Sequence, residues 1–124
     1  MKNYNELDEE LKRVLNEVRT QMNTTVISYP ERNPRDRVWG ANNYPGNCSG
    51  KVGLGFIDKL GADSMFELCA GSGTNYDMCK DYDITYCGID LNPNPVRPGI
   101  KSMDITDFTQ EFPDEIRFAD MVFS

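Results

Sequence analysis

The chain has 124 residues, a length that suits one domain built around one hydrophobic core. A composition with 39% hydrophobic and 27% charged residues is typical of a soluble folded protein and excludes disordered, collagen-like and coiled-coil chains. The formal net charge of −7 is unsuited to holding a phosphate backbone unaided, so a role on DNA would need a local basic patch or further polypeptide.

Neither a membrane segment nor a targeting segment is evident. No apolar run approaches the roughly 20 residues of a membrane-spanning helix. The charged N-terminus has no hydrophobic stretch behind it, so no secretory signal is predicted. We therefore expect a cytoplasmic protein without a membrane partner.

Histidine and cysteine usage excludes several chemistries. The chain has no histidine, which removes Ser-His-Asp and Cys-His catalysis. Its four cysteines include no Cys-x-x-Cys pair, so no zinc site is expected. Cys69 and Cys87 lie within apolar runs and are predicted to be buried core residues.

The first 23 residues are predicted to form an amphipathic helix that Asn3 or Asn5 caps. Apolar residues recur at spacings of three and four, which places them on one helical face. They are Leu7, Leu11, Val14, Leu15, Val18 and Met22. Such a face can bind a partner or pack on its own domain, and the second interpretation is favoured.

Residues 24–50 form an expected long loop, rich in Pro, Gly and Asn. The densest positive charge of the chain lies in it, at Arg32, Arg35 and Arg37. Two interpretations stand equally. The loop is either a surface for phosphate or for the carboxylate of a cofactor, or an ordered lid whose arginines pair with Glu31 and Asp36.

A second helix is predicted after this loop, with Ser49 as its cap and Gly61 as its end. Its apolar residues have helical spacing: Val52, Phe56, Ile57 and Leu60. Gly53 and Gly55 inside a helix each cost about 1 kcal/mol relative to alanine, so they indicate close approach by another backbone or a ligand.

Strand and helix alternate over the rest of the chain, which predicts an α/β fold with a parallel sheet. The expected strands cover residues 64–70, 84–91, 100–103 and 119–123. Between them we expect a short helix over residues 75–81 and a helical turn over residues 108–112.

The stretch from Phe66 to Thr74 (FELCAGSGT) runs from a buried strand through a turn of small residues into a helix. Gly71 and Gly73 permit a sharp turn and a close approach to a bound molecule. The following helix would direct its free N–H groups at the same place. A Gly-x-Gly turn occurs in several nucleotide-binding folds and is weak evidence by itself.

Two acidic residues follow at the ends of the next strands. Asp90 comes slightly under about 20 residues after the glycine turn, where nucleotide-binding α/β folds place a carboxylate on the ribose hydroxyls. Asp104 follows the third strand, near where an adenine amino group would lie. Each aspartate alone would suit a turn, but the glycine turn and both acids in this order favour a nucleoside site.

Three stretches resemble bacterial and phage DNA amino-methyltransferases. Glu67–Thr74 (ELCAGSGT) resembles their cofactor motif, commonly written D-P-F-x-G-S-G-T. Residues 43–50 (NYPGNCSG) are similar to the segment that precedes this motif and helps to hold the methionine end of the cofactor. Residues 119–124 (ADMVFS) look like the strand that leads into the catalytic signature, a polar residue followed by Pro-Pro and an aromatic.

The chain departs from the family pattern in two places. Glu67, Leu68 and Cys69 replace Asp, Pro and Phe, which leaves cofactor binding plausible. The Pro-Pro-aromatic segment is not among the 124 residues, and Ser124 stands where its first, polar member is expected. In the family that segment accepts hydrogen bonds from the target amino group and stacks on the flipped base.

The resemblance implies a truncated, Rossmann-like sandwich of the class I S-adenosylmethionine (SAM) methyltransferases, with about four parallel strands in the order 3-2-1-4. Residues 1–23 would be an N-terminal helix and residues 24–124 the SAM-binding domain. The implied cofactor-binding residues are Asn47, Cys48, Ser49, Glu67, Cys69, Ala70, Gly71, Ser72, Gly73, Thr74, Asp90, Leu91, Asp104 and Ile105.

The function implied is the SAM-binding portion of an enzyme that methylates an exocyclic amine of adenine or cytosine, with DNA bound only when further polypeptide completes the site. An alternative is a catalytically dead remnant that acts as an interaction or regulatory module and self-associates through an exposed sheet edge. A nicotinamide-nucleotide binder is disfavoured, because Tyr76 stands where Gly-x-Gly-x-x-Gly requires its third glycine.

Overall fold

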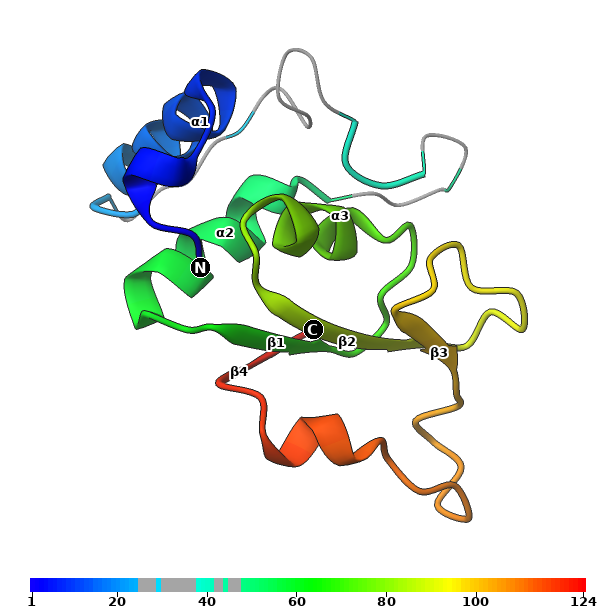
Figure 1. Cartoon of the computed structure of the whole chain (residues 1–124). Helices are drawn as coiled ribbons and strands as arrows, with labels where there is room; N and C mark the ends of the chain where they lie inside the picture. Colours follow the sequence, from blue (N-terminus) through cyan, green and yellow to red (C-terminus); the bar gives the residue numbers. More distant parts are fainter. Residues whose placement is uncertain (25–28, 30–37, 42–43, 45–47) are drawn as a thin grey trace.

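Four parallel strands form the centre of the structure, a computed structural model that describes residues 1–24, 29, 38–41, 44 and 48–124 (Figure 1). The strands are β1 (Ser64–Glu67), β2 (Thr85–Asp90), β3 (Ile100–Ser102) and β4 (Met121–Phe123). Their order in the sheet is β3-β2-β1-β4, which confirms the predicted order. The fold is therefore α/β, with an all-parallel sheet flanked by helices.

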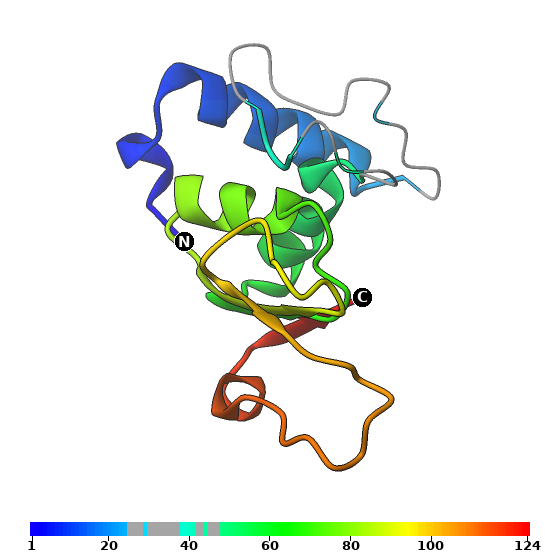
Figure 2. The ribbon, with the colours of Figure 1, turned by 90° about the vertical axis from the view of Figure 1, so that its right-hand side faces the viewer.

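Helices cover the two faces of the sheet unequally (Figures 1 and 2). On one face lie α2 (Gly50–Leu60) and α3 (Thr74–Asp81), with α1 (Glu9–Gln21) packed outside them against α2. The other face carries only the short 3-10 helix η2 (Asp114–Arg117) and the loop that leads to it. None of the helices in the described part of the chain combines the length and the apolar character that a membrane crossing requires.

The predicted amphipathic helix is present as α1, and its apolar face packs on its own domain. Its buried residues are Leu11, Val14, Leu15 and Val18. The predicted caps are wrong: Asp8 caps α1 by accepting a hydrogen bond from the N–H of Leu11 at 2.9 Å. Asn3 precedes a separate 3-10 turn, η1 (Tyr4–Glu6), that contains Asn5. A carboxylate is favoured at a helix N-terminus, where it meets both free N–H groups and the positive end of the helix dipole.

Two ion pairs join α1 to α2. Arg19 donates from Nε and Nη2 to the two carboxylate oxygens of Asp58, at 3.0 and 2.9 Å. The Nζ of Lys51 donates to both oxygens of Glu17, at 3.1 and 3.0 Å. Lys51 is buried, so this second charge is neutralised where water cannot reach it easily. The two ion pairs thus fix the position of α1 along α2, in addition to the apolar packing between the two helices.

Helix α2 begins and ends as predicted. The hydroxyl of Ser49 accepts a hydrogen bond from the N–H of Lys51, and Gly61 ends the helix in the left-handed conformation with φ 63°. The internal glycines were predicted to allow close approach by another backbone or a ligand, and this is wrong at Gly55. The approaching group is the side chain of Met22, the residue after α1, whose sulfur would lie 2.8 Å from a Cβ atom at Gly55.

The first strand is shorter than predicted. It ends at Glu67, and the chain turns at once through Cys69, which adopts φ 57°. The predicted burial of Cys69 is therefore wrong, because a residue in this turn leaves the sheet and its side chain is exposed. Cys87 lies within β2 and is buried, as predicted.

The helical turn predicted over residues 108–112 does not form; the short helix in this region is η2. The carboxylate of Asp107 accepts hydrogen bonds from the N–H and the hydroxyl of Thr109, at 3.0 and 2.6 Å. Such a local bond offers the backbone a turn in place of a helix. The chain becomes helical only after Pro113.

The loop before α2 is described in part. Arg32, Arg35, Arg37, Glu31 and Asp36 lie outside the described residues, and both interpretations of that loop stay open. Trp39 is described and is 1% exposed. Its Nε1 donates to Asp81 of α3 at 2.8 Å, which ties the end of the loop to the helices.

We expect Leu15→Ala to lower the free energy of unfolding by about 2–5 kcal/mol, because Leu15 of α1 is 2% exposed within the core. The matched control is Leu60→Ala on α2, where the side chain is 64% exposed and the change should stay within about 0.5 kcal/mol. Urea unfolding followed by the fluorescence of Trp39 measures both. Equal, small effects would show that α1 is not part of the core.

Candidate functional site

The order of the strands creates a break at the carboxyl ends of β1 and β4. The chain leaves β1 toward β2 on one side, whereas β4 pairs with β1 on the other side. Connections that diverge in this way open a crevice outside the strand ends, and open α/β sheets bind their ligands there. This position is set by topology alone.

A cavity of about 230 Å³ lies at this break. Its wall is formed by the turn after β1, by the first residues of α2 and α3, and by the end of β4. The lining residues are Tyr44, Cys48, Ser49, Val52, Glu67, Cys69, Ala70, Gly71, Ser72, Thr74, Asn75, Phe123 and Ser124. Most of the residues that the family resemblance implies therefore meet at one cavity.

The turn after β1 is held by backbone hydrogen bonds to both neighbouring strands. Leu68 donates to the carbonyl of Phe123 at 2.8 Å, and Ala70 donates to that of Ile89 at 2.9 Å. Gly71 follows with φ 55°, and its N–H donates to the Oδ2 of Asp90 at 2.8 Å. The turn is thus a rigid rim that links the ends of β1, β2 and β4.

Gly73 completes the turn and begins α3. It has φ 78°, a conformation that glycine adopts at no steric cost. A Cβ atom at this position would lie 2.5 Å from the Cγ of Arg97. The guanidinium of Arg97 forms a two-pronged ion pair with Asp77 of α3, at 2.8 and 2.9 Å. The loop after β2 therefore lies closely over the start of α3.

A buried carboxylate, that of Glu67, lines the cavity. Glu67 is 7% exposed and accepts hydrogen bonds from the Nδ2 of Asn75 at 2.9 Å and from the hydroxyl of Tyr86 at 2.6 Å. Burial raises the pKa of Glu67 to about 7, against the two hydrogen bonds, which lower it. The same burial, together with the nearby carboxylate, raises the pKa of Tyr86. Glu67 is thus poised to ionise when a cation binds.

Two helices begin at the wall of the same cavity. Ser49 and Val52 belong to the start of α2, and Thr74 and Asn75 to the start of α3. Gly73 precedes α3 and has no side chain that could cap the first N–H groups of this helix. Helix N-termini favour anions. One small cavity therefore offers both a site for a cation and a site for an anion.

Asp90 lies beside the cavity rather than in its wall. Its Oδ2 accepts from Gly71, and its Oδ1 accepts from the N–H of Asn92 at 2.9 Å. A carboxylate has about four lone-pair positions, so each oxygen can still accept a hydrogen bond from a hydroxyl. The next residue, Leu91, is 71% exposed. This edge is open enough to receive part of a ligand that extends from the cavity.

Asp104 and Ile105 lie on the exposed loop after β3 and do not line the cavity. The carboxylate of Asp104 accepts from the N–H and the hydroxyl of Thr106, at 2.9 and 2.7 Å, and these bonds lower its pKa. This is the turn-forming arrangement considered as the alternative for Asp104 in the sequence. Asn47 lies outside the described residues.

Four residues of the cavity wall were missed in the sequence: Tyr44, Val52, Asn75 and Phe123. Asn75 carried a usable signal, since it stands in the first turn of the helix that follows the glycine turn. It lies so close to α2 that a Cβ atom at Gly53 would be 2.5 Å from its Oδ1. Phe123 reaches the cavity only because β4 pairs with β1, a long-range contact.

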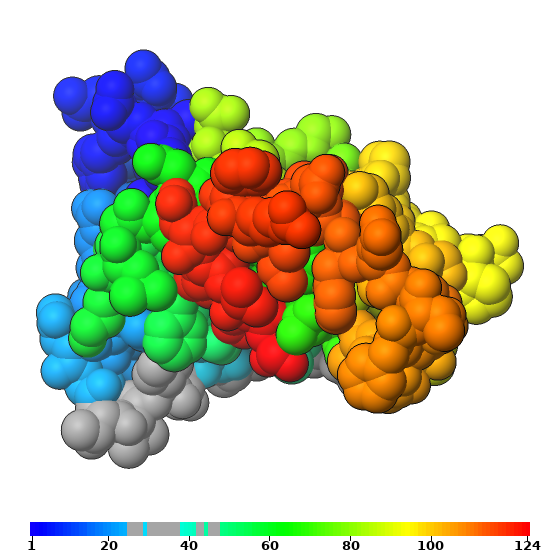
Figure 3. Space-filling view, turned by 90° about the horizontal axis from the view of Figure 1, so that it is seen from below, coloured from blue at the N-terminus to red at the C-terminus, as the bar shows by residue number. Residues whose placement is uncertain are grey.

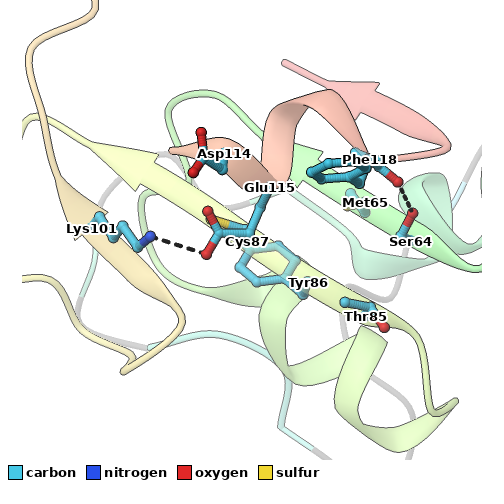
Figure 4. A pocket seen from close by; sticks show the side chains of 10 residues that line it. Ser64, Met65, Thr85, Tyr86, Cys87, Lys101, Asp114, Glu115 and Phe118 are labelled. Carbon is cyan, nitrogen blue, oxygen red and sulfur yellow. Dashed lines mark hydrogen bonds and ion pairs between the residues drawn. The ribbon is translucent and has the colours of Figure 1, made fainter. Parts of the chain in front are cut away.

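A larger cavity of about 480 Å³ lies on the opposite face of the sheet, between β2 and η2 (Figure 4). Figure 3 shows this face from below, with the orange and red segments around η2 lying over it. Figure 4 shows the ion pair of Lys101 with Glu115, at 3.1 Å, across one end of the cavity and Phe118 at the other. Both charged side chains are half exposed, so water screens their charges. This cavity contains none of the residues that the family resemblance implies for cofactor binding.

Comparison of the chain with known protein families, curated proteins and solved structures finds no match. Among the residues that the structure describes, no three His, Cys, Asp or Glu side chains form a group that could hold a metal ion. The functional argument therefore rests on the cavity at the strand ends and on the groups around it.

Ionisation of Glu67 should destabilise the fold. Because its folded pKa of about 7 lies above the ordinary 4.5, its contribution to stability is complete below about pH 4.5 and is lost as the pH rises through about 7. Glu67→Gln cannot ionise. Its stability relative to the wild type should therefore rise by about 1–3 kcal/mol between about pH 5 and about pH 8.5, measured by urea unfolding.

The exposed Glu111 provides the matched control. Glu111→Gln removes the same charge from a solvated position, so its stability relative to the wild type should not change in this way with pH. If the two variants show the same dependence, the carboxylate of Glu67 ionises at an ordinary pKa.

Proposed function

We propose that the chain binds SAM at the cavity between the ends of β1 and β4, as the cofactor-binding portion of a DNA amino-methyltransferase. One observation carries the proposal: the buried carboxylate of Glu67 and the N-terminal residues of α2 and α3 line one cavity of about 230 Å³ at the break in strand order. A cation site and an anion site this close together suit the zwitterion of an α-amino acid, which is the methionine end of SAM.

The size of the cavity agrees with this assignment. Pockets that enclose a whole drug-sized ligand measure about 300–1,000 Å³. A cavity of about 230 Å³ holds a part of such a ligand. In the proposed complex, Glu67 binds the ammonium group of the cofactor, and the first N–H groups of α3, with the hydroxyl of Ser49, bind its carboxylate.

The adenosine part would extend over the open edge beside the cavity. Asp90 stands there with unused acceptor capacity and would bind the ribose hydroxyls. Leu91 and the loop that contains Asp104 and Ile105 would border the base. When bound, SAM supplies an activated methyl group on sulfur. The residues of this chain hold and orient the cofactor, and they keep water from its methionine end.

Methyl transfer to a base requires more than this site. We propose that further polypeptide supplies the Pro-Pro-aromatic segment and the DNA-binding surface, and that the target is the exocyclic amine of adenine or cytosine. The net charge of −7 supports such a division, because it does not favour DNA binding by this chain alone.

A second candidate is an interaction module. The sheet face opposite α2 and α3 exposes Phe118 at 80% and Val122 at 53%, and Phe108 on the loop before η2 is exposed at 97%. Exposed apolar residues in such number favour a binding surface. A folded protein that binds neither SAM nor S-adenosylhomocysteine would leave this candidate as the better one.

Asp90→Ala should weaken the binding of S-adenosylhomocysteine at least about tenfold, because it removes the acceptor for the ribose hydroxyls. Asp90→Asn keeps an acceptor for the N–H of Gly71 and should weaken binding without loss of fold. Isothermal titration calorimetry measures both variants, with circular dichroism as the check on folding. Unchanged affinity would overturn the assignment of Asp90.

The matched control is Asp114→Ala, which removes the same charge from an exposed position on the opposite face of the sheet. Its affinity should equal that of the wild type. An equal loss in both variants would mean that net charge, rather than a contact with the ribose, sets the affinity.

Binding should also depend on pH through Glu67. An ammonium group binds the ionised carboxylate, so affinity should rise by up to about tenfold per pH unit below about pH 7 and level off above it. Glu67→Gln should bind weakly at every pH. Titration calorimetry of S-adenosylhomocysteine from about pH 5.5 to about pH 8 tests this. A flat profile in the wild type would place the ammonium group elsewhere.

A further inference from the structure

Two accessible thiols line the proposed cofactor cavity. Of the four cysteines, Cys48 and Cys69 are exposed, whereas Cys79 and Cys87 are buried. Both exposed cysteines line the cavity at the strand ends. They reach it from different parts of the fold, one from the residue before the cap of α2 and the other from the turn after β1.

The backbone on both sides of Cys69 is held in place. Leu68 donates to the carbonyl of Phe123 at 2.8 Å, and Ala70 donates to that of Ile89 at 2.9 Å. Between these two bonds Cys69 adopts φ 57°, which residues other than glycine, asparagine and aspartate rarely do. The fold thus holds a thiol at the cavity wall in a strained conformation that a glycine would adopt without cost.

Cys48 is anchored by the helix that follows it. It directly precedes Ser49, whose hydroxyl caps α2. The cavity between the two thiols is smaller than those that usually enclose a ligand. A covalent bond between side chains on its wall would therefore occupy the space that the methionine end of SAM needs.

We propose that Cys48 and Cys69 form a reversible redox pair, and that the disulfide between them closes the cavity to SAM. The effect on SAM rests on the proposed function, whereas formation of the disulfide does not. The oxidant is a small disulfide such as oxidised glutathione. One protein thiolate attacks it and releases one glutathione thiolate; the second protein thiolate then attacks the mixed disulfide and releases the other.

The overall exchange balances. Two protein thiols are oxidised to one disulfide, the glutathione disulfide is reduced to two thiols, and the two protons pass to the released thiolates. The buried cysteines are poor partners in this exchange. Burial raises the pKa of Cys79 to about 12 and also raises that of Cys87, which suppresses the reactive thiolate form.

The test is peptide mapping after incubation of the native protein with oxidised glutathione, followed by acid quenching and alkylation. Cys69 and Cys79 share a tryptic peptide, so cleavage at Asp77, which lies between them, is needed to separate them. The expected product joins the peptides of Cys48 and Cys69 and is lost on reduction. Glutathione attached separately to either residue without this link, or a link to Cys79 or Cys87, would overturn the proposal.

Two variants control the mapping. Cys48→Ser should abolish the link, and the matched Cys79→Ala should leave it intact. If Cys48→Ser fails to fold, a ligand-protection experiment on the reduced wild type takes its place. Alkylation of Cys48 and Cys69 should then slow together when S-adenosylhomocysteine is bound. Alkylation of these two thiols at unchanged rates with the ligand bound would overturn their place in the cavity.

Closure of the cavity by the disulfide is tested by measuring ligand affinity before and after oxidation. S-adenosylhomocysteine should bind the oxidised protein at least about tenfold more weakly than the reduced protein, with recovery on reduction. Equal affinities in the presence of the mapped link would overturn closure. If the reduced protein does not bind S-adenosylhomocysteine, the proposed function is wrong. If it binds but the disulfide link does not form, only the proposed redox pair is wrong.

Discussion

The structure depends on the satisfied burial of one carboxylate, that of Glu67. An ionisable group that loses water without gaining partners costs several kcal/mol. Here Asn75 of α3 and Tyr86 of β2 each donate to one of its oxygens, at 2.9 and 2.6 Å. Because Glu67 is the last residue of β1, these bonds fix the start of α3 and the neighbouring strand relative to the strand end. These bonds therefore shape the wall of the cavity. Because the pKa of Glu67 is about 7, a bound cation would favour its ionised form.

The two faces of the sheet differ in a way that bears on function. The larger buried cluster lies under α2 and α3, whereas Phe66 belongs to a separate, smaller cluster on the other face. The opposite face has a small apolar cluster around Cys87, Ile89 and Met103, and η2 covers it in part. The candidate site belongs to the side covered by α2 and α3, where strand ends and helix starts hold its polar groups. The open face offers apolar area without placed polar groups, which suits contact with another polypeptide better than a small ligand.

The glycine turn shows why some site residues were predictable and others were not. Gly71 and Gly73 were predicted from the Gly-x-Gly pattern to permit a sharp strand-to-helix turn, and both adopt left-handed backbone there. Cys69 adopts it too, although no residue pattern indicated this. Its conformation is imposed by the backbone bonds of its neighbours to two other strands. Pairing between strands also brings Phe123 to the cavity, far along the chain from the turn.

The sequence by itself determined the local elements and their order. Apolar periodicity identified α1 and α2, Ser49 and Gly61 marked the ends of α2, and the alternation of strand and helix predicted the parallel sheet, because these are interactions between near neighbours in the chain. Only the tertiary structure decided which side chains share a cavity. The partners of Glu67, the presence of Cys48 and Cys69 at one cavity, and the place of Asp104 in a turn outside it depend on how the elements pack. No local sequence pattern indicates which residues far apart in the chain come together, since burial and long-range pairing are properties of the whole fold.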